Sequence, residues 1–326
     1  MLLNTNARRY RPAFLARLRE LIPEEDIFVS ASEADADRAL AEIVARRYPL
    51  MFCGGGDGTA MHALNRVYHC VRERNDAGEA VRAPAMGFLK LGTGNGWAVQ
   101  MGTPDGIAPV EIVRNAAWSD LRFTPSNLLA ANGLLFDRGG MGLDALTINS
   151  FVELNKRFAG SRLRPLVRGL AGYWAALFFK SFPHLIAHGL RADVRVFNQS
   201  TEPVWRMSET GEPVETNIGP GGLIHEGPVL WVGFGTIRVG GYGFVMFPHA
   251  LKKHGWMNLR IMDISLPRAM RNLRSIYRGV YTGPGFHEFL AQDVRVEFDR
   301  EMPFHRNGDA QGFRREVRVS VAEFEL

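Results

Sequence analysis

Two glycine-rich segments constrain the fold of this chain more than any other feature. Residues 51–59 read Met-Phe-Cys-Gly-Gly-Gly-Asp-Gly-Thr, and residues 89–96 read Leu-Lys-Leu-Gly-Thr-Gly-Asn-Gly. A short apolar run leads into the first segment and a helical pattern, residues 61–67, follows it, so we expect a strand-loop-helix junction. Glycine has no Cβ to block a close approach, and the first N–H groups of the following helix face an anion. Together the two segments predict a nucleoside triphosphate site.

Asp57 places a carboxylate inside the first segment. Polyphosphate repels a carboxylate unless a cation lies between them, so we expect Asp57 to bind Mg²⁺ or a Mg²⁺-bound water. Two standard phosphate loops are excluded, because the sequence has neither Gly-x-x-x-x-Gly-Lys-Ser/Thr nor Gly-x-Gly-x-x-Gly followed by a ribose-binding acid. Taken singly, the glycines also suit a tight turn without a ligand.

The order of the two motifs resembles the catalytic domain of the diacylglycerol and sphingosine kinase family, to which ceramide kinase also belongs. Looser matches extend along roughly residues 1–320, at the opening strand and at residues 142–145, 240–241, 247–250 and 307–309. The resemblance implies ATP and Mg²⁺ as cofactors and a lipid as the substrate. It also implies a set of nucleotide-binding residues: Asn4, Gly55, Gly56, Asp57, Gly58, Thr59, Gly92, Thr93, Gly94 and Asn95. In that set the threonines and glycines hold phosphates, and Asn95 orients the nucleotide or its sugar.

The resemblance further implies a general base. In the family this is the glutamate of an Asp-Gly-Glu motif in the β-rich domain, and here the motif is Asn307-Gly308-Asp309. Asp309 is therefore a candidate catalytic residue beside Asp57, although its side chain is one methylene shorter and the substrate must lie closer. Asn-Gly is also a strong signal for a β-hairpin turn, in which Asp309 is only a neighbour.

Acids of the family motifs are missing at three positions, His62, Gly96 and Asn307. A lone histidine on a helix is more often structural than catalytic. Whether these losses lower activity or change metal use stays open, so one alternative is a catalytically impaired pseudokinase that binds nucleotide or lipid. The other alternative is an NAD kinase, since that family also carries Gly-Gly-Asp-Gly-Thr and a similar two-domain plan.

The pattern of apolar runs divides the chain into two domains. Residues 1–120 alternate short apolar runs with helical patterns, which predicts a Rossmann-like parallel α/β domain that holds the nucleotide. In residues 121–326 short strand patterns dominate, which predicts an antiparallel β-rich sandwich domain for the lipid. Hydrophobic residues at 46% and charged residues at 22% exclude a disordered chain.

Basic residues cluster in two segments that also have an apolar helical pattern. Residues 151–180 and 252–278 contain few acids, and the basic residues of the first are Lys156, Arg157, Arg162, Arg164, Arg168 and Lys180. Each basic residue near an anionic membrane adds up to ~1 kcal/mol of attraction, so we expect binding to anionic lipid. The alternative is that the basic residues of each segment form the solvated face of an ordinary core helix. Nucleic acid is not expected as a partner, because no binding module accompanies the charge.

Two further features bear on location. Cys53 and Cys70 are the cysteines of the chain, which suits a reducing compartment. The longest apolar stretch, residues 170–179, is shorter than the ~20 residues that span a bilayer, and no leader precedes the first domain. We therefore expect a cytoplasmic protein that associates peripherally with the inner face of the membrane. Neither the lipid acceptor nor the oligomeric state has a signal in the sequence.

Overall fold

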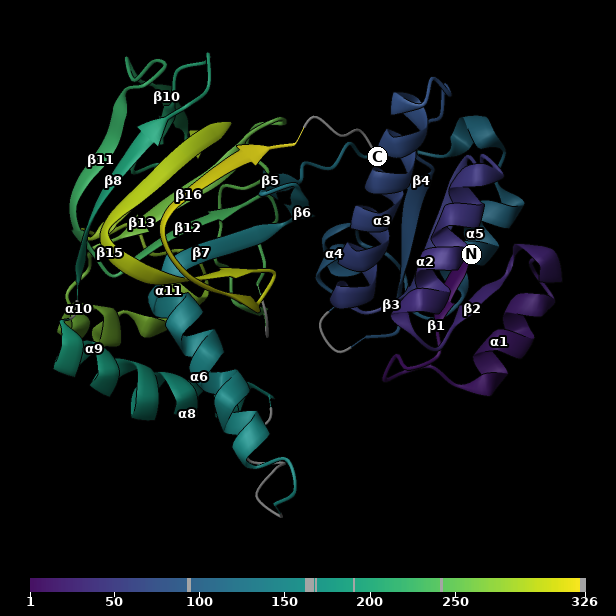
Figure 1. Cartoon of the computed structure of the whole chain (residues 1–326), viewed down its shortest axis with the longest axis horizontal. Coiled ribbons are helices and arrows are strands. Elements are labelled where there is room, and N and C mark those ends of the chain that lie inside the picture. The colour runs from purple at the N-terminus through teal and green to yellow at the C-terminus, as the bar shows by residue number, and fades with distance from the viewer. Residues whose placement is uncertain (93–94, 162–166, 168, 190, 241–242, 323–326) are drawn as a thin grey trace. The chain divides into compact units, whose positions relative to one another are not determined.

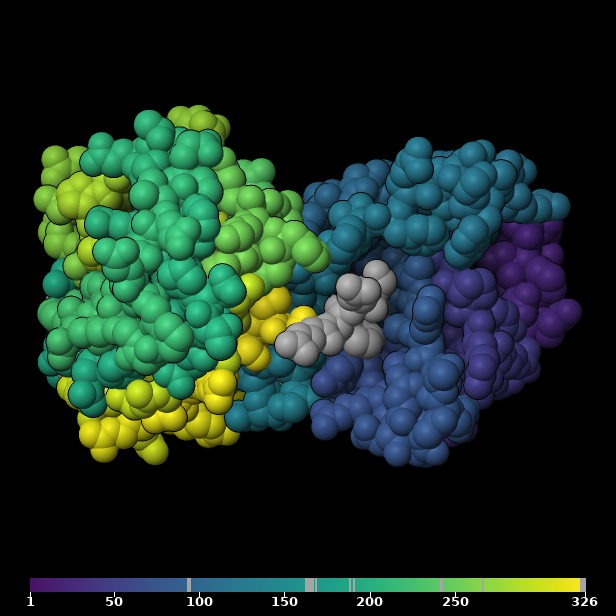
Figure 2. Space-filling model, turned by 90° about the horizontal axis from the view of Figure 1, so that it is seen from above, coloured from purple at the N-terminus to yellow at the C-terminus, as the bar shows by residue number. Residues whose placement is uncertain are grey.

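The computed structural model describes residues 1–92, 95–161, 167, 169–189, 191–240 and 243–322. Contacts divide them into two compact units, residues 1–126 and residues 127–322 (Figure 1). Figure 2 shows the same units with all atoms, the first in purple to blue and the second in teal to yellow. The structural boundary thus lies six residues beyond the expected one at residue 120.

The first unit is built on a parallel sheet with the strand order β2-β1-β3-β4. Its strands are β1 (Leu2–Asn4), β2 (Phe28–Ser30), β3 (Leu50–Gly55) and β4 (Ala85–Lys90). Its helices are α1 (Pro12–Arg19), α2 (Glu33–Ala45), α3 (Asp57–Asp76), α4 (Gly96–Gln100) and α5 (Ala108–Asn115), with single 3₁₀ turns at η1 (Glu24–Asp26) and η2 (Trp118–Asp120). The predicted parallel α/β domain is confirmed.

Helix α3 shows how the sequence pattern becomes structure in this unit. Its buried residues include Ala60, Leu64, Val67 and Val71, spaced three or four apart on one face. That face packs against β3 and α2. The first turn of α3 is thereby held at the end of β3, where the first glycine segment lies.

The second unit is built on a large antiparallel sheet in the order β10-β9-β14-β13-β12-β7-β15-β16-β5-β6, with β8 and β11 joined through β15. Residues 294–298 of the long strand β15 pair with β8, and residues 304–306 pair with β7, so the sheet turns around a shared apolar core. The strands are β5 (Leu129–Ala131), β6 (Leu134–Phe136), β7 (Arg138–Gly142), β8 (Ala192–Asn198), β9 (Trp205–Met207), β10 (Pro213–Glu215), β11 (Leu223–Val229), β12 (Trp231–Gly235), β13 (Met257–Met262), β14 (Phe286–Ala291), β15 (Asp293–Arg306) and β16 (Asp309–Val321). The predicted antiparallel β-rich domain is confirmed.

Helices gather at one end of this sheet (Figure 1). They are α6 (Leu143–Arg157), α8 (Gly169–Ala176), the π-helical turn η3 (Leu177–Ser181), α9 (Phe182–His188), α10 (Leu266–Arg271) and α11 (Leu273–Tyr277). None of the helices in the described ranges is long and apolar enough to cross a membrane. Three basic residues expected to face a membrane, Arg162, Arg164 and Arg168, lie outside the described residues.

His249 gives the second unit a predicted acid sensitivity. Burial, together with Arg260, Lys252 and Arg238, lowers the pKa of His249 from 6.5 to about 4. Protonation therefore favours the unfolded chain, so the stabilisation is complete above the unfolded pKa of 6.5 and is lost as the pH falls towards 4. We expect the second unit to lose up to about 2 kcal/mol over this range, and His249→Gln to remove that loss. Urea unfolding at pH 7 and pH 4.5 measures it, and an unchanged pH dependence in the variant would contradict it.

Candidate active site

The first glycine segment forms a very short connection between β3 and α3. β3 ends at Gly55, Gly56 is the N-cap residue, and α3 begins at Asp57. The expected strand-loop-helix junction is confirmed, but Gly58 and Thr59 lie in the first helical turn instead of a loop. The N–H groups of a first helical turn have no partner within the helix, so they are available to an anion.

The second glycine segment lies directly against the first. A Cβ at Gly92 would come within 2.2 Å of Gly56 Cα, and one at Gly55 would come within 2.4 Å of Thr59 Cβ. Only glycine permits these approaches. Asn4 Nδ2 donates a hydrogen bond to Thr59 Oγ1 at 2.9 Å, which ties the end of β1 to the start of α3. The structure therefore brings together the nucleotide residues that the sequence predicts from three separate segments of the first unit.

Asn95 makes hydrogen bonds within the second glycine segment. Its Oδ1 accepts a hydrogen bond from Gly92 N–H at 2.8 Å, and its Nδ2 donates to Gly92 O at 3.0 Å. It adopts a left-handed backbone conformation, with φ of 54°, and is buried at the start of α4. Both polar groups of the side chain thus close the loop, so Asn95 shapes this segment. Thr93 and Gly94, the other predicted residues of the loop, lie outside the described residues.

Asp57 has an unsatisfied carboxylate oxygen at this junction. Its Oδ1 is buried and has no hydrogen-bond partner in the part of the chain that the structure describes. A void of about 10 Å³, roughly the size of one water molecule, lies beside it. A buried carboxylate oxygen needs a donor or a cation, and Mg²⁺ typically takes one or two carboxylates together with waters and phosphate oxygens. Within the described ranges no three His, Cys, Asp or Glu side chains cluster as a metal site, so such a Mg²⁺ would depend on phosphate and water for its other ligands.

Gly96 lies beside Asp57, at the position where the family motif has an aspartate. A Cβ at Gly96 would lie 3.5 Å from Asp57 Oδ1, with no atom closer. We expect Gly96→Asp to bring a second carboxylate to the same cation and to tighten Mg²⁺ binding about tenfold relative to Gly96→Asn. The Mg²⁺ dependence of thermal unfolding, with ATP present, measures the difference. Equal Mg²⁺ dependence in the two variants would show that Asp57 does not bind the metal.

His62 forms a contact between two helices of the first unit. It lies on α3, and its Nε2 is 2.9 Å from Asp37 Oδ1 of the neighbouring helix α2. The imidazole therefore takes part in helix packing.

Asn307 and Gly308 form a two-residue turn between β15 and β16. Their φ values are 52° and 85°, which is the pattern of a type I′ hairpin turn. The expected hairpin is confirmed, and Asn307 stabilises it by accepting a hydrogen bond from Asp137 N–H at 3.0 Å. Asp309 is the first residue of β16 and is exposed.

Asp309 pairs with Arg306 across the hairpin. Residues paired in this way share one face of a sheet, and successive residues alternate, so Asp309 lies on the face opposite His305. Its carboxylate has no hydrogen-bond or ion-pair partner among the described residues. The carboxylate is thus free to act on a ligand that approaches the turn.

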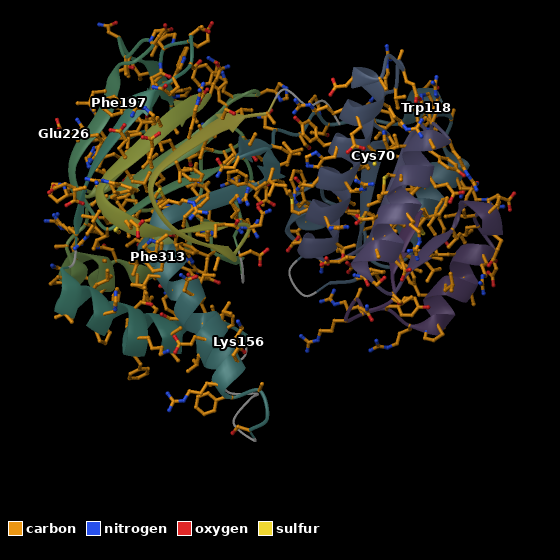
Figure 3. All side chains as sticks on the ribbon, viewed as in Figure 1. Cys70, Trp118, Lys156, Phe197, Glu226 and Phe313 are labelled. Atoms are coloured by element: carbon orange, nitrogen blue, oxygen red, sulfur yellow. The ribbon has the colours of Figure 1, made fainter. Side chains whose placement is uncertain are left out.

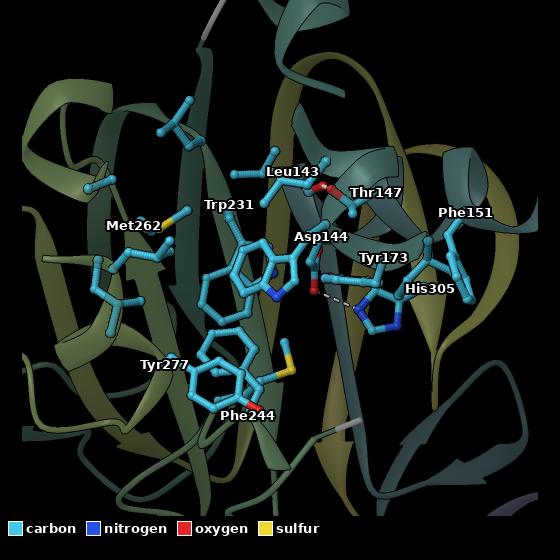
Figure 4. Close-up of a pocket in the computed structure, with 18 of the residues that line it drawn as sticks. Leu143, Asp144, Thr147, Phe151, Tyr173, Trp231, Phe244, Met262, Tyr277 and His305 are labelled. Atoms are coloured by element: carbon cyan, nitrogen blue, oxygen red, sulfur yellow. Dashed lines mark hydrogen bonds and ion pairs between the residues drawn. The ribbon is translucent and has the colours of Figure 1, made fainter. Parts of the chain in front are cut away.

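The second unit contains a cavity of about 340 Å³ between the sheet and its helices (Figure 4). Neighbouring residues of β12 and β13 point to opposite faces, so that Val232 and Leu259 enter the core while Trp231 and Arg260 line the cavity. The opposite wall is apolar and comes from the helices, with Phe151, Tyr173, Trp174, Phe178, Ile276 and Tyr277 among its residues. The sequence does not reveal this cavity, because its lining has the same composition as a core.

Glycines on the floor leave room for the cavity. Gly140 of β7 pairs with Gly233 of β12, and a Cβ at Gly140 would lie 2.5 Å from both Asp144 Oδ2 and Trp231 Nε1. A side chain at this position would therefore displace the polar groups of the site. The run Gly139-Gly140-Met141-Gly142 was the available sequence signal for such a floor.

Asp144 and His305 form the polar end of the cavity. Asp144 Oδ2 is 2.6 Å from His305 Nε2, and its Oδ1 accepts a hydrogen bond from Ala145 N–H at 2.7 Å (Figure 4). Gly308 N–H donates to His305 Nδ1 at 3.3 Å, which assigns the imidazole proton to Nε2. His305, for which the sequence carries no local signal, thus connects the hairpin turn to Asp144.

A buried ion pair lies in the cavity floor. Arg260 Nε is 2.6 Å from Glu288 Oε1, and Asn258 Nδ2 donates to Glu288 Oε2 at 3.0 Å. Burial lowers the pKa of Arg260 and raises the pKa of Glu288. The attraction between the two charges opposes both shifts. The pair fixes β13 to β14 beneath the cavity.

Comparisons with known proteins agree with these features. Residues 4–123 match the model of the diacylglycerol kinase catalytic domain. A probable lipid kinase YegS-like of Pseudomonas aeruginosa (strain UCBPP-PA14) is 31% identical over 152 residues, which are 46% of this chain and 45% of that protein. The chain thus spans less than half the length of that relative.

Two further matches cover most of the chain. A probable lipid kinase YegS of Shigella flexneri is 24% identical over 286 residues, 86% of this chain and 78% of that protein. The crystal structure of a diacylglycerol kinase from Bacillus anthracis str. Sterne shares the fold, with a TM-score of 0.57 and 13% identity over 99% of this chain and 94% of that one. Residues 4–123 therefore match the diacylglycerol kinase catalytic domain, and most of the chain is similar in sequence to a probable lipid kinase YegS.

Proposed function

We propose that this protein transfers the γ-phosphoryl group of ATP to a primary hydroxyl of a membrane lipid, such as diacylglycerol, ceramide or a sphingoid base. The observation that carries the proposal is the apolar cavity of about 340 Å³ with Asp144 and His305 at one end. A hydrocarbon chain fits its apolar wall, and a polar head fits its polar end. The match of residues 4–123 to the diacylglycerol kinase catalytic domain and the similarity to probable lipid kinases support a kinase reaction.

The glycine junction of the first unit supports ATP as the phosphoryl donor. The first turn of α3 presents N–H groups to phosphate, and the close contact of Gly56 with Gly92 keeps side chains out of its way. Mg²⁺ held by Asp57, directly or through water, would neutralise charge on the phosphates.

Asp309 is the proposed general base, because it is exposed, unpartnered and adjacent to the turn residues Asn307 and Gly308 that line the cavity. It takes the proton of the lipid hydroxyl as the hydroxyl oxygen attacks the γ-phosphorus. The new oxygen–phosphorus bond forms while the bond from the γ-phosphorus to the bridging oxygen breaks, and ADP leaves. Phosphorylated lipid and ADP are the products.

Specific features of the structure argue against the two alternatives, an NAD kinase and a pseudokinase. NAD is highly polar, and nothing in its structure calls for an apolar cavity of this kind. A pseudokinase has no need for a carboxylate with a buried, unpartnered oxygen, as at Asp57, or for a free carboxylate, as at Asp309. Catalysis on a lipid accounts for these groups.

We also propose that the helices of the second unit contact an anionic membrane at the inner face. The basic apolar segment expected to lie on lipid has two parts: Tyr173, Trp174 and Phe178 line the cavity, whereas Phe179 is 81% exposed. Ile186 is also well exposed on α9. Lys156 lies at the end of α6 (Figure 3) and belongs to the basic residues that would face anionic head groups.

Replacing Phe179 and Ile186 with aspartate is expected to weaken binding to vesicles by at least ~100-fold, because each exposed apolar side chain contributes ~1.5–3 kcal/mol when fully buried in lipid and the two losses add. Sedimentation with vesicles of phosphatidylglycerol and phosphatidylcholine measures the loss. Phe313→Asp, an exposed phenylalanine on β16 (Figure 3), is the control and should bind as wild type. Equal loss in the control, or no loss in the double variant, would contradict the membrane face.

The proposed activity is tested by offering diacylglycerol, ceramide, sphingosine and NAD side by side to the enzyme with labelled ATP and Mg²⁺. We expect label in one or more of the lipids and none in the NAD. Label in NAD alone would identify an NAD kinase. No label despite measurable ATP binding would favour the pseudokinase.

A further inference from the structure

Trp231 carries a buried hydrogen-bond donor without a partner. The residue is 5% exposed, and its Nε1 has no hydrogen-bond acceptor within the described ranges. Buried indole N–H groups usually have an acceptor, because burial without one costs their hydrogen bond to water. Trp231 also lines the cavity, so a ligand in the cavity is able to supply the missing acceptor.

This donor faces the same space as an acceptor. Trp231 Nε1 and Asp144 Oδ2 both lie 2.5 Å from the point that a Cβ at Gly140 would occupy, so they are separated by at most twice that distance. Figure 4 shows the indole nitrogen and the carboxylate side by side, next to the ring of His305. The carboxylate only accepts hydrogen bonds, and the indole only donates them.

We propose that Trp231 Nε1 and Asp144 together hold one hydroxyl oxygen of the bound lipid and select a hydroxyl head over an ammonium head. In the complex without ATP a hydroxyl donates to Asp144 and accepts from Trp231 at the same time, and for phosphoryl transfer its proton turns from Asp144 to Asp309. An ammonium only donates, which leaves the indole N–H unpaired, and an ether oxygen only accepts, so it makes no hydrogen bond to the carboxylate. Trp231 is thus a positioning and specificity residue that favours a hydroxyl at this point of the cavity over an ammonium or an ether oxygen.

This role rests on the lipid binding of the proposed function but does not require phosphoryl transfer. Three probes of equal chain length distinguish a hydroxyl, an ether and an ammonium head: decan-1-ol, 1-methoxydecane and decylammonium. NMR spectra of protein with ¹⁵N-labelled indoles report on binding of each probe without ATP. The signal of Trp231 is assigned as the one that disappears in Trp231→Phe. We expect decan-1-ol to shift this signal and to bind about 10-fold more tightly than either analogue.

Trp231→Phe keeps the ring and removes the N–H group. We expect it to weaken decan-1-ol about 10-fold and to leave decylammonium unchanged, so that the preference for the alcohol is lost. Trp256→Phe is the matched control, since Trp256 is equally buried, at 4% exposure, and does not line the cavity. It should keep the wild-type preference.

The proposal is overturned if decan-1-ol does not bind, if it binds without moving the Trp231 signal, or if wild type binds the ammonium as tightly as the alcohol or more tightly. It is also overturned if Trp231→Phe weakens all three probes equally, since that result identifies a packing role. The expected probe preferences without phosphoryl transfer from ATP would support this inference and contradict the kinase. Phosphoryl transfer to a lipid, together with a Trp231 signal that does not move, would support the kinase and contradict this inference.

Discussion

Replacing Asp309 with asparagine lowers kcat for lipid phosphorylation by about 10²- to 10⁴-fold, the usual contribution of a general base. Asparagine has nearly the same size but does not take up the proton of the attacking hydroxyl. Since Asp309 is exposed and unpartnered, the substitution should leave KM for ATP, KM for lipid and the midpoint of thermal unfolding unchanged. Steady-state kinetics and thermal unfolding of the purified variant provide these values.

Two further variants serve as controls for this result. Asp309→Glu restores the longer carboxylate of the family motif and should retain most of the activity. Asp144→Asn removes the carboxylate of the cavity and should mainly raise KM for the lipid, because Asp144 is assigned to binding. Wild-type kcat in Asp309→Asn, with a large loss of kcat in Asp144→Asn, would transfer the base to Asp144 and refute our assignment.

Ile148→Trp shortens the chain that the enzyme accepts. Ile148 lies on α6 and lines the cavity, so a larger side chain there occupies space that we assign to hydrocarbon. Excluding three methylene groups costs ~2.4 kcal/mol, which predicts a loss of about 50-fold in kcat/KM for long-chain lipids. Short-chain acceptors should react at nearly the wild-type rate. Measuring kcat/KM over a series of diacylglycerols of increasing chain length tests this.

Ile112→Trp is the matched control for the cavity variant. Ile112 is 54% exposed on α5 of the first unit, so the same substitution there should leave the chain-length profile unchanged. If Ile148→Trp and wild type have the same profile, the lipid chain does not lie in the cavity.

Local patterns in the sequence predict the fold and half of the site. The 3.6-residue period of α3 and the two glycine segments predict the nucleotide junction, because both depend on neighbours close in the chain. Gly56 and Gly92 then meet because adjacent parallel strands end at the same edge of a sheet, which is a general property of such sheets.

The acceptor site depends on contacts between distant residues and is less predictable. His305 and Asp144 are 161 residues apart, and no local pattern shows that they touch. Tyr173 and Phe178 have the spacing of a membrane-facing helix, yet they line the cavity, because an apolar face packs equally well on lipid, core or ligand. Asn95 shows a related limit: its sequence position predicts nucleotide binding but not the two hydrogen bonds that its side chain makes with backbone groups of Gly92.

The most direct test of the central claim is to follow the label of ATP carrying ³²P at either the γ or the α position, with Mg²⁺ and diacylglycerol in mixed micelles. Label in the extracted lipid and ADP in solution are measured together, with Asp57→Ala as the inactive control. We predict lipid label from the γ position only, in equal amount to the ADP formed, and none in the control. ADP without labelled lipid, or neither product with any acceptor lipid, would contradict a lipid kinase.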